Sequence, residues 1–154
     1  MKYFYDTEFI EDGETIDLVS IGIVAEDGRT YYAISTQFDE EKADDWVKKN
    51  VISKLEQNPL LWKSRNKIKE DIIAFIGEDK PELWAYYAGY DHVVLCQLFG
   101  RMIDLPSNFP FYTRDIKQLC DSLGNPKLPV QENEHNALDD AKWNKEAYEF
   151  LINN

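Results

Sequence analysis

The first eight residues, MKYFYDTE, constrain this chain more than any other stretch. They are rich in aromatic residues typical of strands and end in two carboxylates. A strand points alternate side chains to one face, so Phe4, Asp6 and Glu8 share a face, with the two carboxylates about 6–7 Å apart. Two anions held this close beside a core repel each other unless a cation lies between them. We therefore expect a divalent metal ion there, with further ligands supplied by distant parts of the chain.

The spacing of this acidic pair is common in so acidic a protein. The chain has 29 acidic residues among 154, and the same acidic-x-acidic pattern recurs at Asp12/Glu14, Asp39/Glu41 and Glu132/Glu134. The pair Asp6 and Glu8 stands out only because it ends an aromatic strand and because matching partners occur downstream.

The bulk properties favour one domain that covers residues 1–154. The hydrophobic content of 44% can supply a core, and no apolar run approaches the roughly 18 residues of a membrane span. We see no secretory signal at the N-terminus, and we expect Cys96 and Cys120 to be reduced core residues. These features predict a cytoplasmic protein with no membrane partner.

The net charge of −12 restricts the partners of the protein. It argues against a broad basic surface that grips duplex nucleic acid through many phosphates. It favours a metal-dependent enzyme with a local site, or a partner that is small, basic or cationic.

The order of elements predicts a mixed sheet flanked by helices. Turn signals separate three successive antiparallel strands, and helices then alternate with two shorter strands. Gly22, inside the second strand, indicates a bulge or a close approach of another backbone. The expected strands are 1–8, 16–25, 29–36, 81–87 and 109–113. The expected helices are 38–55 (capped by Asp39), 64–77, 90–102 (with Met102 inward), 113–124 (capped by Thr113) and 137–152 (capped by Asn136).

Four short motifs, spread over nearly the whole chain, carry a family resemblance. In order they are YDTEFIEDG, YAGYDHV, FYTRDIKQL and EHNALDDA. The motifs place two acidic residues at a strand end, a third at a helix start, and a histidine five positions before a last aspartate. This arrangement resembles the DEDD family of 3′–5′ exonucleases, in its histidine subclass. The closest likeness is to the small mycobacterial-type 3′–5′ exoribonuclease group, related to ribonuclease T and oligoribonuclease.

This resemblance implies a ribonuclease H-like fold with a five-stranded sheet, and a role for each motif residue. Asp6 bridges two ions, Glu8 and Asp140 complete the ligands of the first, and Asp91 holds the second. Oxygen ligands without a Cys/His cluster favour Mg²⁺ or Mn²⁺ over Zn²⁺. His135 is the expected general base, because an imidazole can accept a proton from water near pH 7.

Each assignment has a structural alternative. Asp91 could be an ordinary helix cap, and His135 a surface residue. Asp139 neighbours Asp140, but it points about 100° away around a helix, and the family spacing selects Asp140. His92 falls outside the resemblance and is expected to be a partly exposed helix residue.

The expected substrate is single-stranded RNA, including short oligonucleotides, with DNA 3′ ends as an alternative. Thr7, Phe9 and Tyr90 are the residues expected to contact the terminal nucleotide, because bases of single strands stack on aromatic faces. Arg114 and Lys117 could meet phosphates or be ordinary solvated charges, and the other aromatic residues near Tyr90 (Trp84, Tyr86 and Tyr87) are expected mostly in the core. The family resemblance also allows a homodimer.

Two other functions remain open at this point. A non-catalytic nucleic-acid- or protein-binding module on the same fold would explain the acidic surface through a basic partner. An endonuclease of the ribonuclease H type also uses clustered carboxylates. The His135 and Asp140 pair favours the exonuclease.

Overall fold

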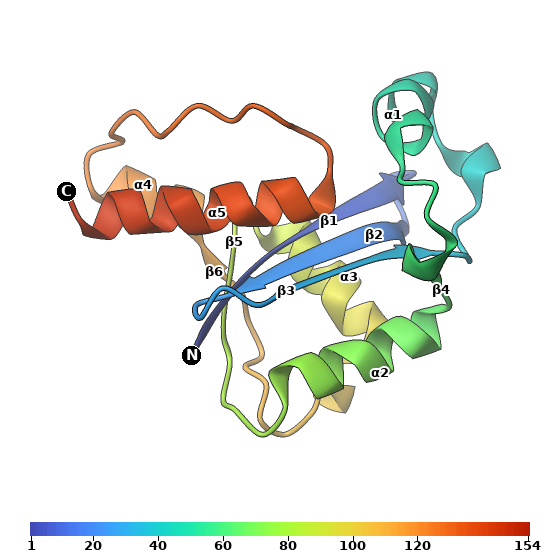
Figure 1. Cartoon of the computed structure of the whole chain (residues 1–154), viewed down its shortest axis with the longest axis horizontal. Coiled ribbons are helices and arrows are strands. Elements are labelled where there is room, and N and C mark those ends of the chain that lie inside the picture. Colours follow the sequence, from blue (N-terminus) through green and yellow to red (C-terminus); the bar gives the residue numbers. More distant parts are fainter.

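The frame of the protein is a six-stranded mixed sheet, seen in a computed structural model that describes residues 1–154 (Figure 1). The strand order is β4-β3-β2-β1-β5-β6. β2 pairs antiparallel with both β1 and β3, and the other neighbouring strands pair in parallel. The strands are β1 Lys2–Glu11, β2 Ile16–Ala25, β3 Thr30–Ser35, β4 Trp62–Lys63, β5 Glu82–Ala85 and β6 Arg114–Asp115. The predicted mixed sheet with three antiparallel strands first is confirmed, with one more strand than expected.

Helices cover both faces of this sheet (Figure 1). The α-helices are α1 Asp45–Asn50, α2 Arg65–Ile76, α3 Gly89–Phe99, α4 Ile116–Ser122 and α5 Ala137–Ile152, and the 3₁₀ turns are Glu40–Lys42, Ile52–Lys54, Pro59–Leu61 and Met102–Asp104. Tyr3 and Tyr5 of β1 pack in one core with α2 and α3, whereas Phe4 packs in a second core with α4 and α5. The alternation of β1 therefore directs Asp6 and Glu8 to the face that carries α5.

The predicted helix over 38–55 is wrong. The segment instead contains two 3₁₀ turns and the short helix α1, which has no buried residue. Asp39 and Asp44 each cap a separate turn through a side-chain oxygen, so the segment restarts rather than continuing as one helix. The apolar residues Ala43, Val51 and Leu55, which suggested one helical face, are buried from the flanks of α1.

Three smaller predictions also differ from the structure: the last strand, the cap of α4 and the position of Met102. The last strand is Arg114–Asp115 rather than 109–113. Asp115, not Thr113, caps α4, because its carboxylate accepts a hydrogen bond from the Lys117 backbone N–H at 2.9 Å. Met102 is exposed, because α3 ends at Phe99 and Gly100 turns the chain with a positive φ of 125°.

Gly22 lets the start of α5 lie directly against β2. A Cβ atom at this position would be 2.5 Å from the backbone oxygen of Ala137 and 2.5 Å from the backbone nitrogen of Leu138. Further along α5, the buried Asn144 donates a hydrogen bond to the carbonyl oxygen of Tyr5 at 3.0 Å. The predicted close backbone approach at Gly22 is confirmed, and it fixes the first turn of α5 over the acidic end of β1.

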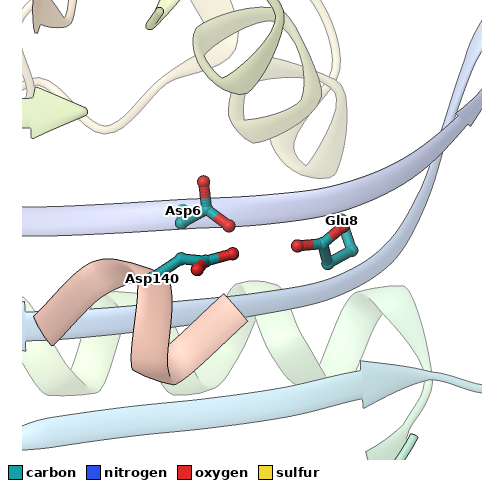
Figure 2. Close-up of side chains that lie close together, drawn as sticks. All are labelled: Asp6, Glu8 and Asp140. Carbon is teal, nitrogen blue, oxygen red and sulfur yellow. The ribbon is translucent and has the colours of Figure 1, made fainter. Parts of the chain in front are cut away.

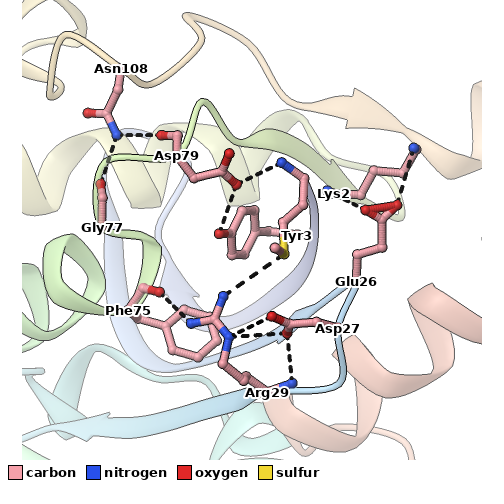
Figure 3. Close-up of polar contacts among 10 residues, drawn as sticks. Lys2, Tyr3, Glu26, Asp27, Arg29, Phe75, Gly77, Asp79 and Asn108 are labelled. Atoms are coloured by element: carbon pink, nitrogen blue, oxygen red, sulfur yellow. Dashed lines mark hydrogen bonds and ion pairs between the residues drawn. The ribbon is translucent and has the colours of Figure 1, made fainter.

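A polar network secures the other end of β1 (Figure 3). The hydroxyl of Tyr3 donates to Asp79 at 3.1 Å, and Asn108 donates to the Asp79 carbonyl at 2.7 Å. Arg29, directly before β3, donates to the carbonyl of Phe75 in α2 at 2.8 Å. These contacts join β1 and the start of β3 to α2 and to the segments that follow α2 and α3, so β1 is held at both ends.

Both cysteines, Cys96 and Cys120, are free and buried, as expected. None of the helices has the length and apolar character needed to span a bilayer.

Candidate metal centre and active site

Three carboxylates from two distant parts of the sequence meet over the middle of the sheet (Figure 2). Asp6 and Glu8 project from β1, and Asp140 projects toward them from the first turn of α5. One oxygen from each of these three residues lies within 4.8 Å of the others. Carboxylate oxygens are the ligands that Mg²⁺ and Mn²⁺ prefer, so the chemistry of this group fits such an ion.

The position of Asp140 follows from the way α5 begins. Asn136 caps the helix and accepts hydrogen bonds from the backbone N–H groups of Leu138 at 3.0 Å and Asp139 at 3.1 Å. The carboxylate of Asp140 in turn accepts hydrogen bonds from the backbone N–H of His135 at 3.2 Å and from the side chain of Gln131. Asp140, rather than its neighbour Asp139, therefore lies beside Asp6 and Glu8.

Burial and mutual repulsion make this cluster unfavourable when all its members are charged. Burial, followed by repulsion from neighbouring carboxylates, raises the pKa of Asp6 well above its ordinary range. Burial and the proximity of Asp140 raise the pKa of Glu8 to about 8. Burial also raises the pKa of Asp140, although hydrogen bonds to its charged form oppose the shift. A bound cation would remove this repulsion.

Asp91 lies close to this cluster without being part of it. It is the third residue of α3, only 5% exposed, and it is not the helix cap, which is Ala88. Its Oδ1 accepts hydrogen bonds from the backbone N–H of Thr7 at 3.0 Å and from the Thr7 hydroxyl at 2.5 Å. Burial raises the pKa of Asp91 to about 6, against the effect of the Thr7 hydrogen bonds. Thr7 thus joins β1 to α3, and its side chain is buried against Asp91 rather than open to solvent.

His135 lies at the edge of the cluster, at the end of the loop before α5. Its backbone has a positive φ of 71°, and its side chain is 34% exposed. The imidazole packs nearly perpendicular to the indole ring of Trp46, with 5.0 Å between the ring centroids. The structure thus brings His135 next to Asp140, the residue to which its backbone N–H donates.

Aromatic side chains lie on two sides of the acidic residues. Phe9 follows Glu8 across a register shift in β1, and its ring meets that of Tyr90 edge to face at 5.9 Å. Tyr90 is 53% exposed. A cavity of about 380 Å³ is lined by Asp6, His135 and Asp140 together with Tyr86, Tyr87, Gln131, Glu134, Trp143 and Asn144. Of the aromatic residues expected in the core, Trp84 is buried, whereas Tyr87 is exposed.

Two residues that contact the site, Gln131 and Trp46, could not be predicted from the sequence. Gln131 is in a polar loop, and nothing in its surroundings indicates that its amide would reach Asp140. Trp46 has the spacing of a core residue in the predicted helix, yet it is exposed and meets His135.

His92 is a partly exposed residue of α3, as expected, with its Nδ1 at 2.8 Å from the Thr113 hydroxyl.

The fold is shared with solved exonucleases. Exonuclease I in its apo form superposes with a TM-score of 0.63 and 10% identity, covering 98% of this chain and 41% of that one. A full-length 3′-exonuclease superposes with a TM-score of 0.56 and 13% identity, covering 99% of this chain and 81% of that one. The chain thus spans about two fifths of exonuclease I. These similarities show that the chain shares the fold of these exonucleases.

The family follows from sequence similarity. The model of the "3'-5' exoribonuclease Rv2179c-like domain" matches residues 1–152, so the chain belongs to this family. It is 52% identical over 147 residues to the 3'-5' exoribonucleases Rv2179c and MT2234.1 of two Mycobacterium tuberculosis strains, covering 92% of this chain and 88% of each relative. The predicted family is confirmed, and the protein is a hydrolytic exonuclease.

Proposed function

We propose that the protein removes nucleoside 5′-monophosphates one at a time from the 3′ ends of single-stranded RNA, with two Mg²⁺ or Mn²⁺ ions. The observation that carries this proposal is the convergence of Asp6, Glu8 and Asp140 within 4.8 Å, in a chain of an exoribonuclease family. Both mycobacterial relatives are named as 3'-5' exoribonucleases, which supports RNA as the substrate.

The four acidic residues divide the ligand roles in this proposal. Asp6, Glu8 and Asp140 would hold the first ion, and Asp6 and Asp91 would hold the second. Asp91 would act in part through water, since its Oδ1 already accepts two hydrogen bonds from Thr7. Bound divalent cations make water a stronger acid and offset the negative charge that develops on a phosphate during displacement.

The residues of the chain then position the substrate and move one proton. Phe9 and Tyr90 hold the terminal nucleotide by contact with its base and sugar. His135 takes a proton from the attacking water as the new phosphorus–oxygen bond forms. The bond from phosphorus to the 3′ oxygen of the preceding nucleotide breaks, and that oxygen gains a proton from solvent. The products are a nucleoside 5′-monophosphate and an RNA shortened by one residue.

A single assay tests this proposal. RNA labelled at its 5′ end is incubated with the protein in Mg²⁺, in Mn²⁺ and in EDTA, beside the same RNA with a blocked 3′ end. We expect a ladder of products that shorten from the 3′ end, with activity lost in EDTA and on the blocked RNA. Cleavage in EDTA, or internal cuts in the blocked RNA, would contradict the proposal. A matched DNA strand measures the preference between the two nucleic acids.

A further inference from the structure

We propose that Trp46 is a positioning residue that holds the imidazole of His135 in its working orientation. The inference rests on the proposed role of His135 as general base. It comes from one contact: the indole of Trp46 and the imidazole of His135 meet at 5.0 Å between centroids, with an angle of 88° between their planes. This edge-to-face arrangement lies in the favourable range for two aromatic rings.

His135 needs such support because the rest of its surroundings fix only its backbone. The backbone N–H of His135 donates a hydrogen bond to Asp140, and the backbone has a positive φ of 71°. Neither ring nitrogen has a hydrogen-bond partner in the structure, and the nearest carboxylate oxygen, on Glu134, is 3.7 Å from Nε2. A general base must present one nitrogen within hydrogen-bond reach of the proton that it takes. The Trp46 ring is the group in place to limit rotation of the imidazole.

The location of Trp46 has no other evident structural purpose. The helix that carries it, α1, buries none of its residues, and Trp46 is 55% exposed. The backbone around it is nevertheless well fixed, because Asp44 caps the helix at Val47 with a 2.8 Å hydrogen bond and the side chain of Asn50 donates to the Trp46 carbonyl at 2.9 Å. A large aromatic side chain on a fixed, exposed helix can thus serve as a support for the ring that it touches.

Trp46 could instead serve as a stacking platform for a base, and kinetics separate these roles. A positioning residue affects the chemical step, whereas a platform affects RNA affinity. The variants are Trp46→Ala, Trp46→Phe, His135→Ala and the double variant. Leu60→Ala is the control, since Leu60 is an exposed apolar side chain of the same segment, between β3 and α2. Each is assayed for single-turnover cleavage rate, RNA affinity in Ca²⁺, and Mn²⁺ affinity.

We expect Trp46→Ala to slow single-turnover cleavage about threefold to tenfold, the effect of one aromatic contact of this kind. RNA and Mn²⁺ affinities should stay unchanged, Trp46→Phe should recover most of the rate, and Leu60→Ala should match the parent protein. In the His135→Ala background, Trp46→Ala should cause no further loss, because a residue that acts only through another has no effect once its partner is gone. A loss of RNA affinity instead of rate, or losses that simply add, would overturn the proposal.

Proton NMR of the imidazole rings tests the contact without any reaction. The protein has two histidines, so the His135 resonances are identified by their absence in His135→Ala. We expect Trp46→Ala to move the His135 ring protons and leave those of His92 in place. If they do not move, the positioning inference fails while the base role stands. If His135→Ala cleaves as fast as the parent protein, the base role itself fails, and the inference with it.

Discussion

Asp6 is the residue on which the candidate centre depends most, since its side chain projects from β1 and is surrounded by three other carboxyl groups. Its pKa is raised first by burial and then by Asp91, Glu8 and Asp140. In the metal-free protein its charge is therefore a source of instability, whereas in the proposed mechanism it is indispensable.

Asp6→Asn should separate these two effects. We expect at least a 100-fold loss of cleavage rate, because a bound ion contributes several kcal/mol to transition-state stabilisation and about 1.4 kcal/mol is a factor of ten. The same variant should unfold at a higher temperature than the parent protein in EDTA at pH 8, since one repelling charge is gone. Glu11→Gln, on an exposed residue of the same strand, should change neither quantity. A variant of Asp6 that loses both activity and stability would instead mean that this residue is structural.

Sequence patterns at the residue scale predicted which carboxylates converge, but not which groups support them. The alternation of β1 directed Asp6 and Glu8 to one face, and the spacing implied by the family resemblance selected Asp140 over Asp139. The contacts of Gln131 and Trp46 depend on where two irregular segments cross in space, and no local periodicity encodes such a crossing. The structure therefore brings together Asp6, Glu8 and Asp140 as expected, whereas Asp91 lies close by but outside this group.

At the scale of elements, the decisive contact is that between β2 and the start of α5. Gly22 permits this contact, because the backbone of Ala137 and Leu138 occupies the space of a Cβ atom. In the sequence, a glycine inside a strand of β-branched residues indicated this close approach. By contrast, the apolar spacing over 38–55 predicted one helix that does not form. Asp39 and Asp44 cap separate turns, and the buried apolar residues lie on the flanks of α1.

Gly22→Ala should therefore damage the centre from a distance. The new methyl group would meet backbone atoms that cannot rotate away, so the first turn of α5 must shift and carry Asp140 with it. We expect a loss of stability of about 1–3 kcal/mol, typical of overpacking, and a weaker affinity for Mn²⁺. Thermal unfolding and calorimetric titration measure the two effects. Gly89→Ala is the control, because it lies in α3 with open space around its Cβ position. Unchanged Mn²⁺ affinity in Gly22→Ala would show that Asp140 does not depend on this contact.

At the scale of the whole molecule, the acidic cluster links stability to pH and to metal. The pKa values of Asp6, Glu8, Asp91 and Asp140 are all raised in the folded protein. Between the unfolded value of about 4 and the folded value of about 8 for Glu8, the native state holds protons that the unfolded chain has released. The stability that these bound protons give to the folded state is thus present at low pH and is lost as the pH rises. The pKa of His92 is lowered in the folded protein, so this one group makes stability rise with pH, but only below about pH 6.5.

The metal-free protein should therefore become less stable from pH 5.5 to pH 8. We expect its melting temperature in EDTA to fall by several degrees over this range, since about 1 kcal/mol corresponds to about 2–4 °C for a chain of this size. Saturating Mn²⁺ should raise the melting temperature most at pH 8, where the carboxylates are charged and the ion binds only the folded state. A melting temperature that rises with pH in EDTA would contradict the assigned direction of these pKa shifts.

The position of Asp140 on α5 also determines when the centre can exist. Asp6 and Glu8 precede His135 and Asp140 by more than 120 residues, so they leave the ribosome well before the segment that carries α5. On the proposed mechanism, a nascent polypeptide that has folded its sheet still lacks the third carboxylate and the base. A nuclease arranged in this order has no means of degrading RNA until α5 has been made and has packed on the sheet.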